Sequence, residues 1–152
     1  MPREPYETPD PRERASYPHW EEHVLRFADT DIVLHVNPVA ILEIFESARV
    51  QFWRAIGLYP WHEDEGFMQV RAVTDFLGEV SAPGRVRVGS RVMQVGARSA
   101  VWRQGLFGED GVCRMLMATT SAHIHYKALR ATPVPDALRA HLTAETLRRG
   151  PA

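Results

Sequence analysis

Residues 37–57 run NPVAILEIFESARVQFWRAIG, and this stretch decides the fold. Asn37 is a favoured helix N-cap, and Pro38 suits the first helical position because its missing N–H would have no partner there. Gly57 supplies the backbone freedom with which helices often end. Apolar side chains recur between these ends at helical spacing, at Ile41, Phe45, Ala48, Phe52 and Ile56. The sequence therefore predicts an amphipathic helix over residues 38–56.

Most of the remaining chain has the composition of β-strands. Residues 21–27 favour a first strand, which the short polar side chains of residues 28–31 interrupt before the helix. After the helix we expect strands and a short final helix, over residues 67–77, 85–92, 99–107, 112–126 and 135–147. One long helix followed by antiparallel strands predicts an α+β fold, in which a curved antiparallel sheet wraps around the helix.

The composition bounds the class of protein. The chain has 152 residues, 45% of them hydrophobic and 24% charged, which suits one compact domain with a substantial core. A formal net charge of -1 argues against a nucleic-acid binder that relies on a broad basic surface. Prolines are concentrated in residues 1–18, which we expect to form an extended arm before a single domain over residues 19–152.

Cysteine usage and local motifs bound the compartment and the cofactors. Cys113 is the only cysteine, which excludes an intrachain disulfide and indicates a reducing, cytoplasmic compartment. No apolar run approaches the roughly 20 residues of a membrane helix, and the N-terminus lacks the apolar core of a signal peptide. The sequence contains no phosphate-binding glycine loop, dinucleotide fingerprint or serine nucleophile elbow, so no cofactor is expected.

Several short motifs follow one another in a characteristic order. The first three are Arg26-Phe27-Ala28-Asp29-Thr30-Asp31, His35-Val36-Asn37 and Phe45-Glu46-Ser47-Ala48-Arg49. The later ones are Asp75-Phe76-Leu77, Pro83-Gly84, Gly96 with Ser99, and Pro133 with Pro135. Over residues 22–142 they resemble the hotdog-fold acyl-CoA thioesterases of the 4-hydroxybenzoyl-CoA thioesterase group. The resemblance implies a hotdog fold, a homodimer or homotetramer with a continuous sheet and sites between subunits, and hydrolysis of an acyl-CoA or acyl-carrier-protein thioester.

The resemblance places the catalytic carboxylate on Asp31, the second aspartate of the Asp-Thr-Asp turn. A carboxylate near a helix N-terminus shares its surroundings with N–H groups that stabilise an oxyanion. Asp31 would then activate a water molecule as a general base or attack the thioester carbonyl as a nucleophile, and the sequence leaves both open. The structural alternative is that Asp31 only accepts hydrogen bonds from the amides of its turn.

His35 and Asn37 are the other two candidate catalytic residues. The resemblance implies that this pair positions the thioester carbonyl or a water molecule beside Asp31. For Asn37 the alternative is a helix cap, which contributes about 1 kcal/mol to stability, and both roles are compatible. For His35 the alternative is a loop histidine without a role.

The chain departs from the family pattern at Leu34, where a glycine is common, at Pro38, where a second asparagine is common, and at Ile41, where a tyrosine is common. Leucine at position 34 would narrow the backbone approach to the thioester or move the oxyanion donors. These departures leave a second function open, namely a catalytically silent hotdog module that binds an acyl thioester or a protein partner.

Further groups of side chains have ordinary interpretations that we favour over functional ones. His123 and His125 suggest two metal ligands but are more simply histidines on a sheet face, so no metal site is expected. Cys113 alternates in phase with Met115 and Met117, which predicts a buried thiol. Asp29 is more simply structural, and Glu46 and Arg49 are more simply an ordinary ion pair than catalytic groups. Five arginines could bind the phosphates of coenzyme A, but we favour a solvated sheet face for them: Arg85, Arg87, Arg91, Arg98 and Arg103.

Overall fold

The computed structural model describes residues 9–58 and 64–151 of the chain. Its helices are α1 (Pro38–Ala55) and α2 (Asp136–Thr146), with 3-10 turns η1 (Arg14–Ser16) and η2 (Phe27–Asp29). Its strands are β1 (His19–Leu25), β2 (Glu65–Phe76), β3 (Gly84–Val95), β4 (Ser99–Phe107), β5 (Cys113–His125) and β6 (Arg130–Ala131).

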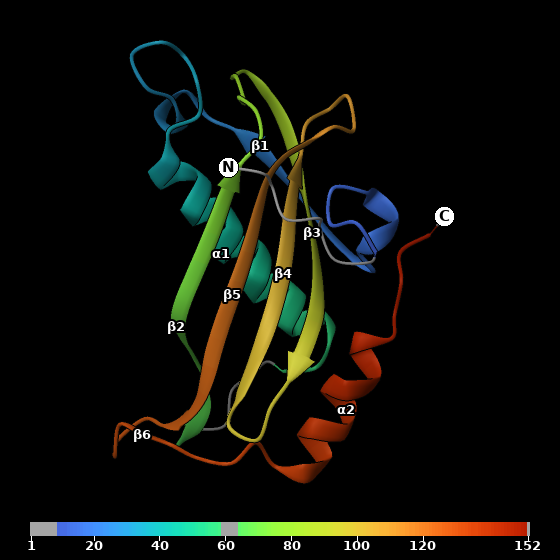
Figure 1. The fold of residues 1–152 in the computed structure, drawn as a ribbon. Helices are drawn as coiled ribbons and strands as arrows, with labels where there is room; N and C mark the ends of the chain where they lie inside the picture. Colours follow the sequence, from blue (N-terminus) through green and yellow to red (C-terminus); the bar gives the residue numbers. More distant parts are fainter. Residues whose placement is uncertain (1–8, 59–63, 152) are drawn as a thin grey trace, which may run out of the picture.

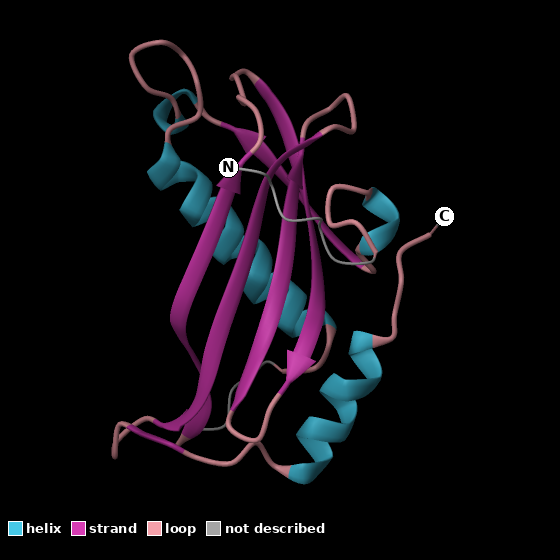
Figure 2. Cartoon of the chain, viewed as in Figure 1, coloured by secondary structure: helices cyan, strands magenta, loops and turns pink. Residues whose placement is uncertain are grey.

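The strands form one antiparallel sheet in the order β1-β3-β4-β5-β2, and the short β6 pairs with β5. Helix α1 runs across one face of this curved sheet, as Figure 1 shows. Figure 2 shows the same arrangement by secondary structure, with α2 beside the lower end of β3. The predicted α+β architecture, a sheet wrapped around one long helix, is confirmed.

The predicted helix 38–56 is confirmed to within one residue, and its ends have the predicted causes. The Asn37 side chain accepts a hydrogen bond from the Ala40 amide at 2.9 Å, and Pro38 occupies the first helical position. Gly57 follows the helix with a φ of 79°, in the left-handed region that favours glycine. The buried face of α1 consists of Ala40, Ile41, Ile44, Phe45, Ala48, Arg49, Phe52 and Trp53.

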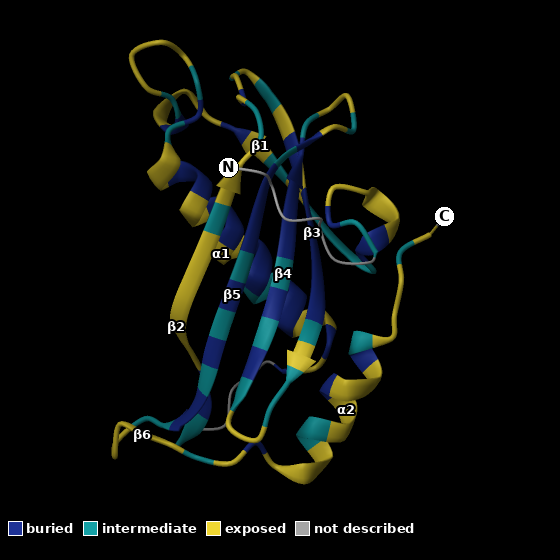
Figure 3. Cartoon of the chain, in the orientation of Figure 1, coloured by how far each residue is buried: buried dark blue, intermediate teal, exposed yellow. Residues whose placement is uncertain are grey.

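Alternation in β3 sorts its side chains between the two faces of the sheet. The side chains facing α1 are almost fully buried, namely Val86, Val88, Ser90 and Val92. Arg85 and Arg87 are exposed on the opposite, outer face, as predicted for a solvated side of the strand. Figure 3 shows the middle of β3 as continuously buried, because the outer face is covered there as well. Arg91 is buried on this outer face, unlike Arg85 and Arg87.

The chain before β1 covers part of the outer face. The structure describes residues 9–18 of the arm predicted over residues 1–18. This segment contains η1, and the fully buried Tyr17 follows η1 directly. The Tyr17 hydroxyl donates a hydrogen bond to the Pro11 carbonyl at 2.7 Å. Its ring packs so closely on β3 that a Cβ at Gly89 would lie 2.5 Å from Tyr17 Cγ. Glycine therefore allows this segment to lie directly on the sheet.

Cys113 is buried as predicted, but on the opposite face from Met115 and Met117. It packs with Tyr17 and Phe107, whereas the two methionines belong to the core beneath α1. The cause is a register shift between Leu106 and Phe107, which pairs Phe107 with Cys113 and interrupts the alternation. The predicted common phase of Cys113, Met115 and Met117 is therefore wrong.

The remaining element boundaries differ little from the predicted ones. The first strand ends at Leu25 because the chain turns into η2, so Arg26 and Phe27 lie outside it. The final helix was expected over residues 135–147 and spans Asp136–Thr146, while β6 had no counterpart among the expected strands. Across the described parts of the chain, neither helix combines the length and the apolar character that crossing a bilayer requires.

Candidate active site

The segment between β1 and α1 is held by the buried carboxylate of Asp29. This carboxylate accepts hydrogen bonds from the Arg26 amide at 2.7 Å and from the Arg26 guanidinium at 2.7 Å. Hydrogen bonding to Arg26 holds the pKa of Asp29 below its usual value. The Asp29 carbonyl accepts from the Asn37 amide at 2.9 Å, so the two ends of the loop are tied together. Asp29 is structural, as the sequence indicated.

Asp31 lies on the loop that the hydrogen bond between Asp29 and Asn37 closes. The two oxygens of its carboxylate differ in their contacts. Asp31 Oδ1 accepts hydrogen bonds from the Val33 amide at 2.9 Å and from the His35 amide at 3.1 Å. The structural alternative for Asp31 is therefore present in the fold. Among the hydrogen bonds of the described residues, however, Oδ2 accepts none, and the Asp31 side chain is exposed.

A cavity of about 400 Å³ opens beside this carboxylate. It lies between the loop, the first turn of α1 and the end of β2, where Figure 1 shows these segments close together. Its polar side chains are Asp31, His35 and Glu79. Its other lining residues are mainly apolar, namely Val36, Pro38, Ile41, Phe76, Leu77, Gly78, Val80 and Met115. The positive end of the α1 dipole thus borders the cavity that holds the carboxylate.

His35 shares this cavity and pairs with a residue that the sequence did not suggest. His35 Nε2 lies 3.4 Å from Glu79 Oε2. The backbone brings them together, because His35 bridges Ser81 and the Val36 amide donates to the Val80 carbonyl at 2.8 Å. No local pattern around Glu79 indicates this role, since the contact depends on pairing between segments that are far apart in the sequence.

Asn37 is not brought into the cavity with Asp31 and His35. Its side-chain oxygen caps α1, and its side-chain amide donates to the Asp29 carbonyl at 3.2 Å. Both polar atoms of Asn37 thus hold the loop and the helix. The cap interpretation describes its contacts, and a direct role in the chemistry remains a prediction.

Leu34 has a backbone conformation that favours glycine. Its φ is 61°, a left-handed value that costs a leucine roughly 1 kcal/mol. The side chain is 53% exposed and does not line the cavity. The expected narrowing by Leu34 is therefore not seen, because the side chain is exposed outside the cavity.

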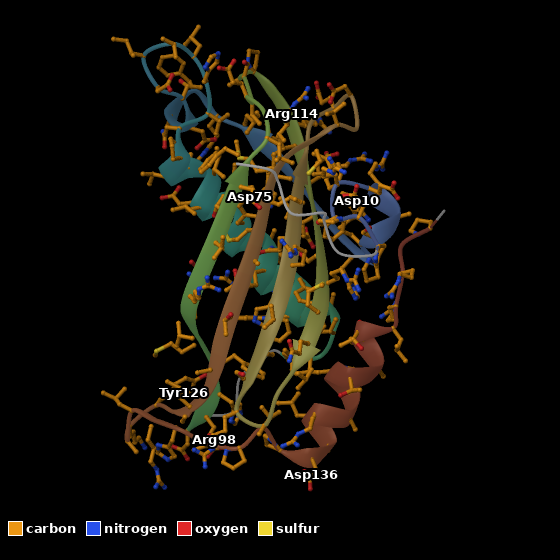
Figure 4. All side chains as sticks on the ribbon, in the orientation of Figure 1. Asp10, Asp75, Arg98, Arg114, Tyr126 and Asp136 are labelled. Atoms are coloured by element: carbon orange, nitrogen blue, oxygen red, sulfur yellow. The ribbon has the colours of Figure 1, made fainter. Side chains whose placement is uncertain are left out.

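The other predicted groups lie away from this cavity. His123 is buried and bonded to the Thr132 hydroxyl at 2.9 Å, while His125 accepts from the Ala128 amide. Within residues 9–58 and 64–151, His, Cys, Asp and Glu side chains form no cluster of three that suits a metal ion. Arg49 is buried on α1, 3.5 Å from Glu46, which is the expected ion pair of one helical turn. The arginines do not converge on one site, since Arg98 lies at the far end of the sheet (Figure 4).

A curved antiparallel sheet around one long helix, with the Asp31 loop leading into that helix, is the architecture of a hotdog protein. The sequence profile of the Thioesterase-like superfamily matches residues 25–142. The chain therefore belongs to the Thioesterase-like superfamily, as the motifs predicted. A search of curated protein sequences finds no significant match.

Solved structures with the same fold support this assignment. PA5185 from Pseudomonas aeruginosa strain PAO1 is 25% identical, with a TM-score of 0.76 over 87% of this chain and 94% of that one. SAV2348 from Staphylococcus aureus, solved in complex with CoA, is 15% identical, with a TM-score of 0.77 over 88% of this chain and 85% of that one. Slr0204 from Synechocystis, a 1,4-dihydroxy-2-naphthoyl-CoA thioesterase, is 17% identical, with a TM-score of 0.70 over 82% and 94% of the two chains. The last two likenesses show the fold alone.

Proposed function

We propose that the protein hydrolyses an acyl-CoA or aroyl-CoA thioester to the free acid and coenzyme A. The observation that carries this proposal is the Asp31 carboxylate at the mouth of the cavity where α1 begins. Family membership supports thioester chemistry, and SAV2348 and Slr0204 are relatives in fold whose names include CoA or a CoA thioester. The acyl group itself stays open.

Asp31 suits either of two balanced reaction routes. As a general base, it takes a proton from water while the water oxygen bonds to the thioester carbon; the C–S bond then breaks and the thiolate takes up the proton. As a nucleophile, a carboxylate oxygen bonds to the thioester carbon and expels the thiolate, and water then hydrolyses the resulting anhydride. In both routes the positive end of α1 stabilises the negative charge that develops on the carbonyl oxygen.

The walls of the cavity favour an apolar acyl group. Ile41, Phe76 and Met115 line it from α1, β2 and β5, so they surround the acyl chain with hydrocarbon and an aromatic ring. A polar acyl group would find few partners here beyond Asp31, His35 and Glu79. An aliphatic or aromatic acid is therefore the proposed product.

We further propose that a second copy of the chain completes the site. The edge strand β2 has twelve residues, and no other described strand pairs with its outer side. Its exposed apolar side chains include Val70 at 61% and Phe76 at 55%. Pairing of two β2 edges would cover these side chains and continue the sheet. Because Phe76 also lines the cavity, the partner would then adjoin the acyl pocket. Gel filtration with light scattering tests this assembly directly.

A silent binding module remains the second candidate function. The observation that favours it is that Asp31 and Asn37 both make structural hydrogen bonds, so their presence has an explanation without catalysis. Such a module would bind the acyl thioester in the same cavity without turnover.

The deciding experiment measures thiol release from a panel of acyl- and aroyl-CoA thioesters for the native protein and for Asp31→Asn. Asparagine keeps a side-chain oxygen for the Val33 and His35 amides, so the loop stays intact while the charge is lost. Asp136→Asn is the matched control, because Asp136 is an exposed carboxylate at the start of α2 that does not line the cavity and lies away from β2. We expect a loss of about 10² to 10⁴ in kcat for Asp31→Asn and none for the control. Binding without turnover in the native protein would favour the silent module, and full activity in Asp31→Asn would remove the carboxylate from the mechanism.

A further inference from the structure

A second depression, of about 410 Å³, lies on the outer face of the sheet beside β1, β3 and the hairpin between β4 and β5. Three guanidinium groups line it, from Arg14, Arg85 and Arg87. Arg85 Nη1 lies 2.8 Å and Arg87 Nε 3.2 Å from the carboxylate of Glu22, which sits between them. Arg85 and Arg87 are nevertheless more than half exposed, at 58% and 55% of their side-chain surface. The depression therefore offers accessible cationic groups.

A third depression, of about 290 Å³, joins this cationic group to the cavity of Asp31. It shares Glu79 and Val80 with the Asp31 cavity, and it shares Arg85, Gly108 and Glu109 with the cationic depression. The three form a continuous track along one end of the sheet, the end at which Figure 4 labels Arg114. A long ligand anchored at Asp31 thus has a surface path to the three arginines.

Charges change sign along this track. Its middle part contains Glu79, Glu109 and Asp110, and the last of these is paired with Arg114. At the far end the balance reverses, because three arginines, Arg14, Arg85 and Arg87, line the depression together with two carboxylates, Glu22 and Glu109. A ligand that matches this order is neutral near the cavity and anionic at its far end, because phosphates beside the middle carboxylates would be repelled.

Resting on the function proposed above, we infer that Arg14, Arg85 and Arg87 form the subsite for the phosphates of coenzyme A, while the neutral pantetheine arm follows the middle of the track. Guanidinium groups are well suited to phosphate because they donate two parallel hydrogen bonds. The inference favours coenzyme A over a carrier protein, because three arginines match the several phosphates of coenzyme A, whereas the pantetheine arm of a carrier protein carries a single phosphodiester.

Glu22 competes with the phosphates for the same two arginines. Hydrogen bonds from Arg87 and Arg85 hold the pKa of Glu22 below its usual value, so it is ionised at neutral pH. A bound phosphate must therefore displace this carboxylate or share the guanidinium groups with it. Glu22→Gln removes the charge but keeps the shape of the side chain, so it should strengthen phosphate binding, whereas replacement of the arginines should weaken it.

The test compares one acyl group presented as its CoA thioester and as its pantetheine thioester, which lacks all phosphates. In the double variant Arg85→Gln, Arg87→Gln we expect KM to rise about tenfold for the CoA thioester and to stay unchanged for the pantetheine thioester. Glu22→Gln lowers KM for the CoA thioester only. Arg130→Gln is the matched control, because Arg130 is an exposed arginine of β6 outside the track and away from the β2 edge, and it changes neither KM.

Calorimetric binding of free coenzyme A and of adenosine 3′,5′-bisphosphate gives a readout that needs no turnover. Arginine-dependent binding without thiol release supports the subsite and overturns the proposed hydrolysis. Thiol release with equal KM for the CoA thioester in the native protein and the double variant overturns the subsite and leaves hydrolysis intact. If the arginine variants raise KM for an acyl-carrier-protein thioester but not for the CoA thioester, the assignment to coenzyme A is overturned.

Discussion

Asn37 separates the structural from the catalytic interpretation of the loop, so its replacement makes a decisive prediction. Asn37→Ala removes the cap on the Ala40 amide, which costs about 1 kcal/mol. It also removes the side-chain hydrogen bond to the Asp29 carbonyl, which contributes about 0.5–1 kcal/mol because that carbonyl keeps the Asn37 backbone amide as a donor. We therefore expect the free energy of unfolding to fall by about 1.5–2 kcal/mol.

Urea unfolding followed by circular dichroism measures this loss. With a slope of about 2 kcal/mol per molar urea, the midpoint should fall by roughly 0.75–1 M. Asn37→Ser is the control variant, because serine retains the cap but lacks the amide, and it should recover most of the loss.

The structural and catalytic interpretations differ in the activity that they predict for Asn37→Ala. Because the Asn37 side chain contacts the backbone and does not line the cavity, Asn37→Ala should retain kcat within a few-fold under conditions in which it is folded. If kcat of fully folded Asn37→Ala drops by about 10² or more, this reasoning is refuted. An unchanged urea midpoint would refute the assigned cap.

Three further predictions concern buried groups. Gly89→Ala should lower the free energy of unfolding by about 1–3 kcal/mol in thermal or urea unfolding, because its Cβ would lie 2.5 Å from Tyr17 Cγ. Burial raises the pKa of the Cys113 thiol to about 11, so at pH 8 iodoacetamide should modify the folded protein more than about tenfold more slowly than the urea-unfolded chain. Burial lowers the pKa of His23, against an opposing effect of Glu21, so the unfolded state takes up this proton first as pH falls below about 6.5 and stability decreases. Unfolding midpoints between pH 7 and pH 5 should therefore fall less steeply for His23→Gln than for the native protein.

Local chemistry determined the elements that the sequence predicted well. The helix 38–56 is bounded by Asn37, Pro38 and Gly57, each of which acts through its own backbone or through a neighbour within four residues. The alternation of Val86 and Arg87 likewise follows from strand geometry alone. Such features need no knowledge of distant contacts, so a single sequence contains them.

The errors have nonlocal causes. The phase of Cys113 changed because a register shift opposite Phe107 interrupts the alternation, and nothing in the sequence of β5 marks that shift. Arg91 is buried where an exposed arginine was expected, on the face that the Tyr17 segment also covers. These outcomes depend on which segment covers which face, and periodicity within one strand does not encode that choice.

The candidate site shows the same division between local and distant information. Asp31 and His35 share one loop, and the sequence placed them together because its motif is local. Glu79 joins them only through the bridge between His35 and Ser81, which links segments separated by most of α1 and β2. The surface ion pair between His35 and Glu79 contributes little to stability, so its role is to position the His35 imidazole. The loop builds its own turn with Asp31 Oδ1 and leaves Oδ2 without an internal donor among the described residues. A structural and a catalytic role are therefore compatible in one carboxylate, because Oδ1 holds the loop and Oδ2 is left for the chemistry.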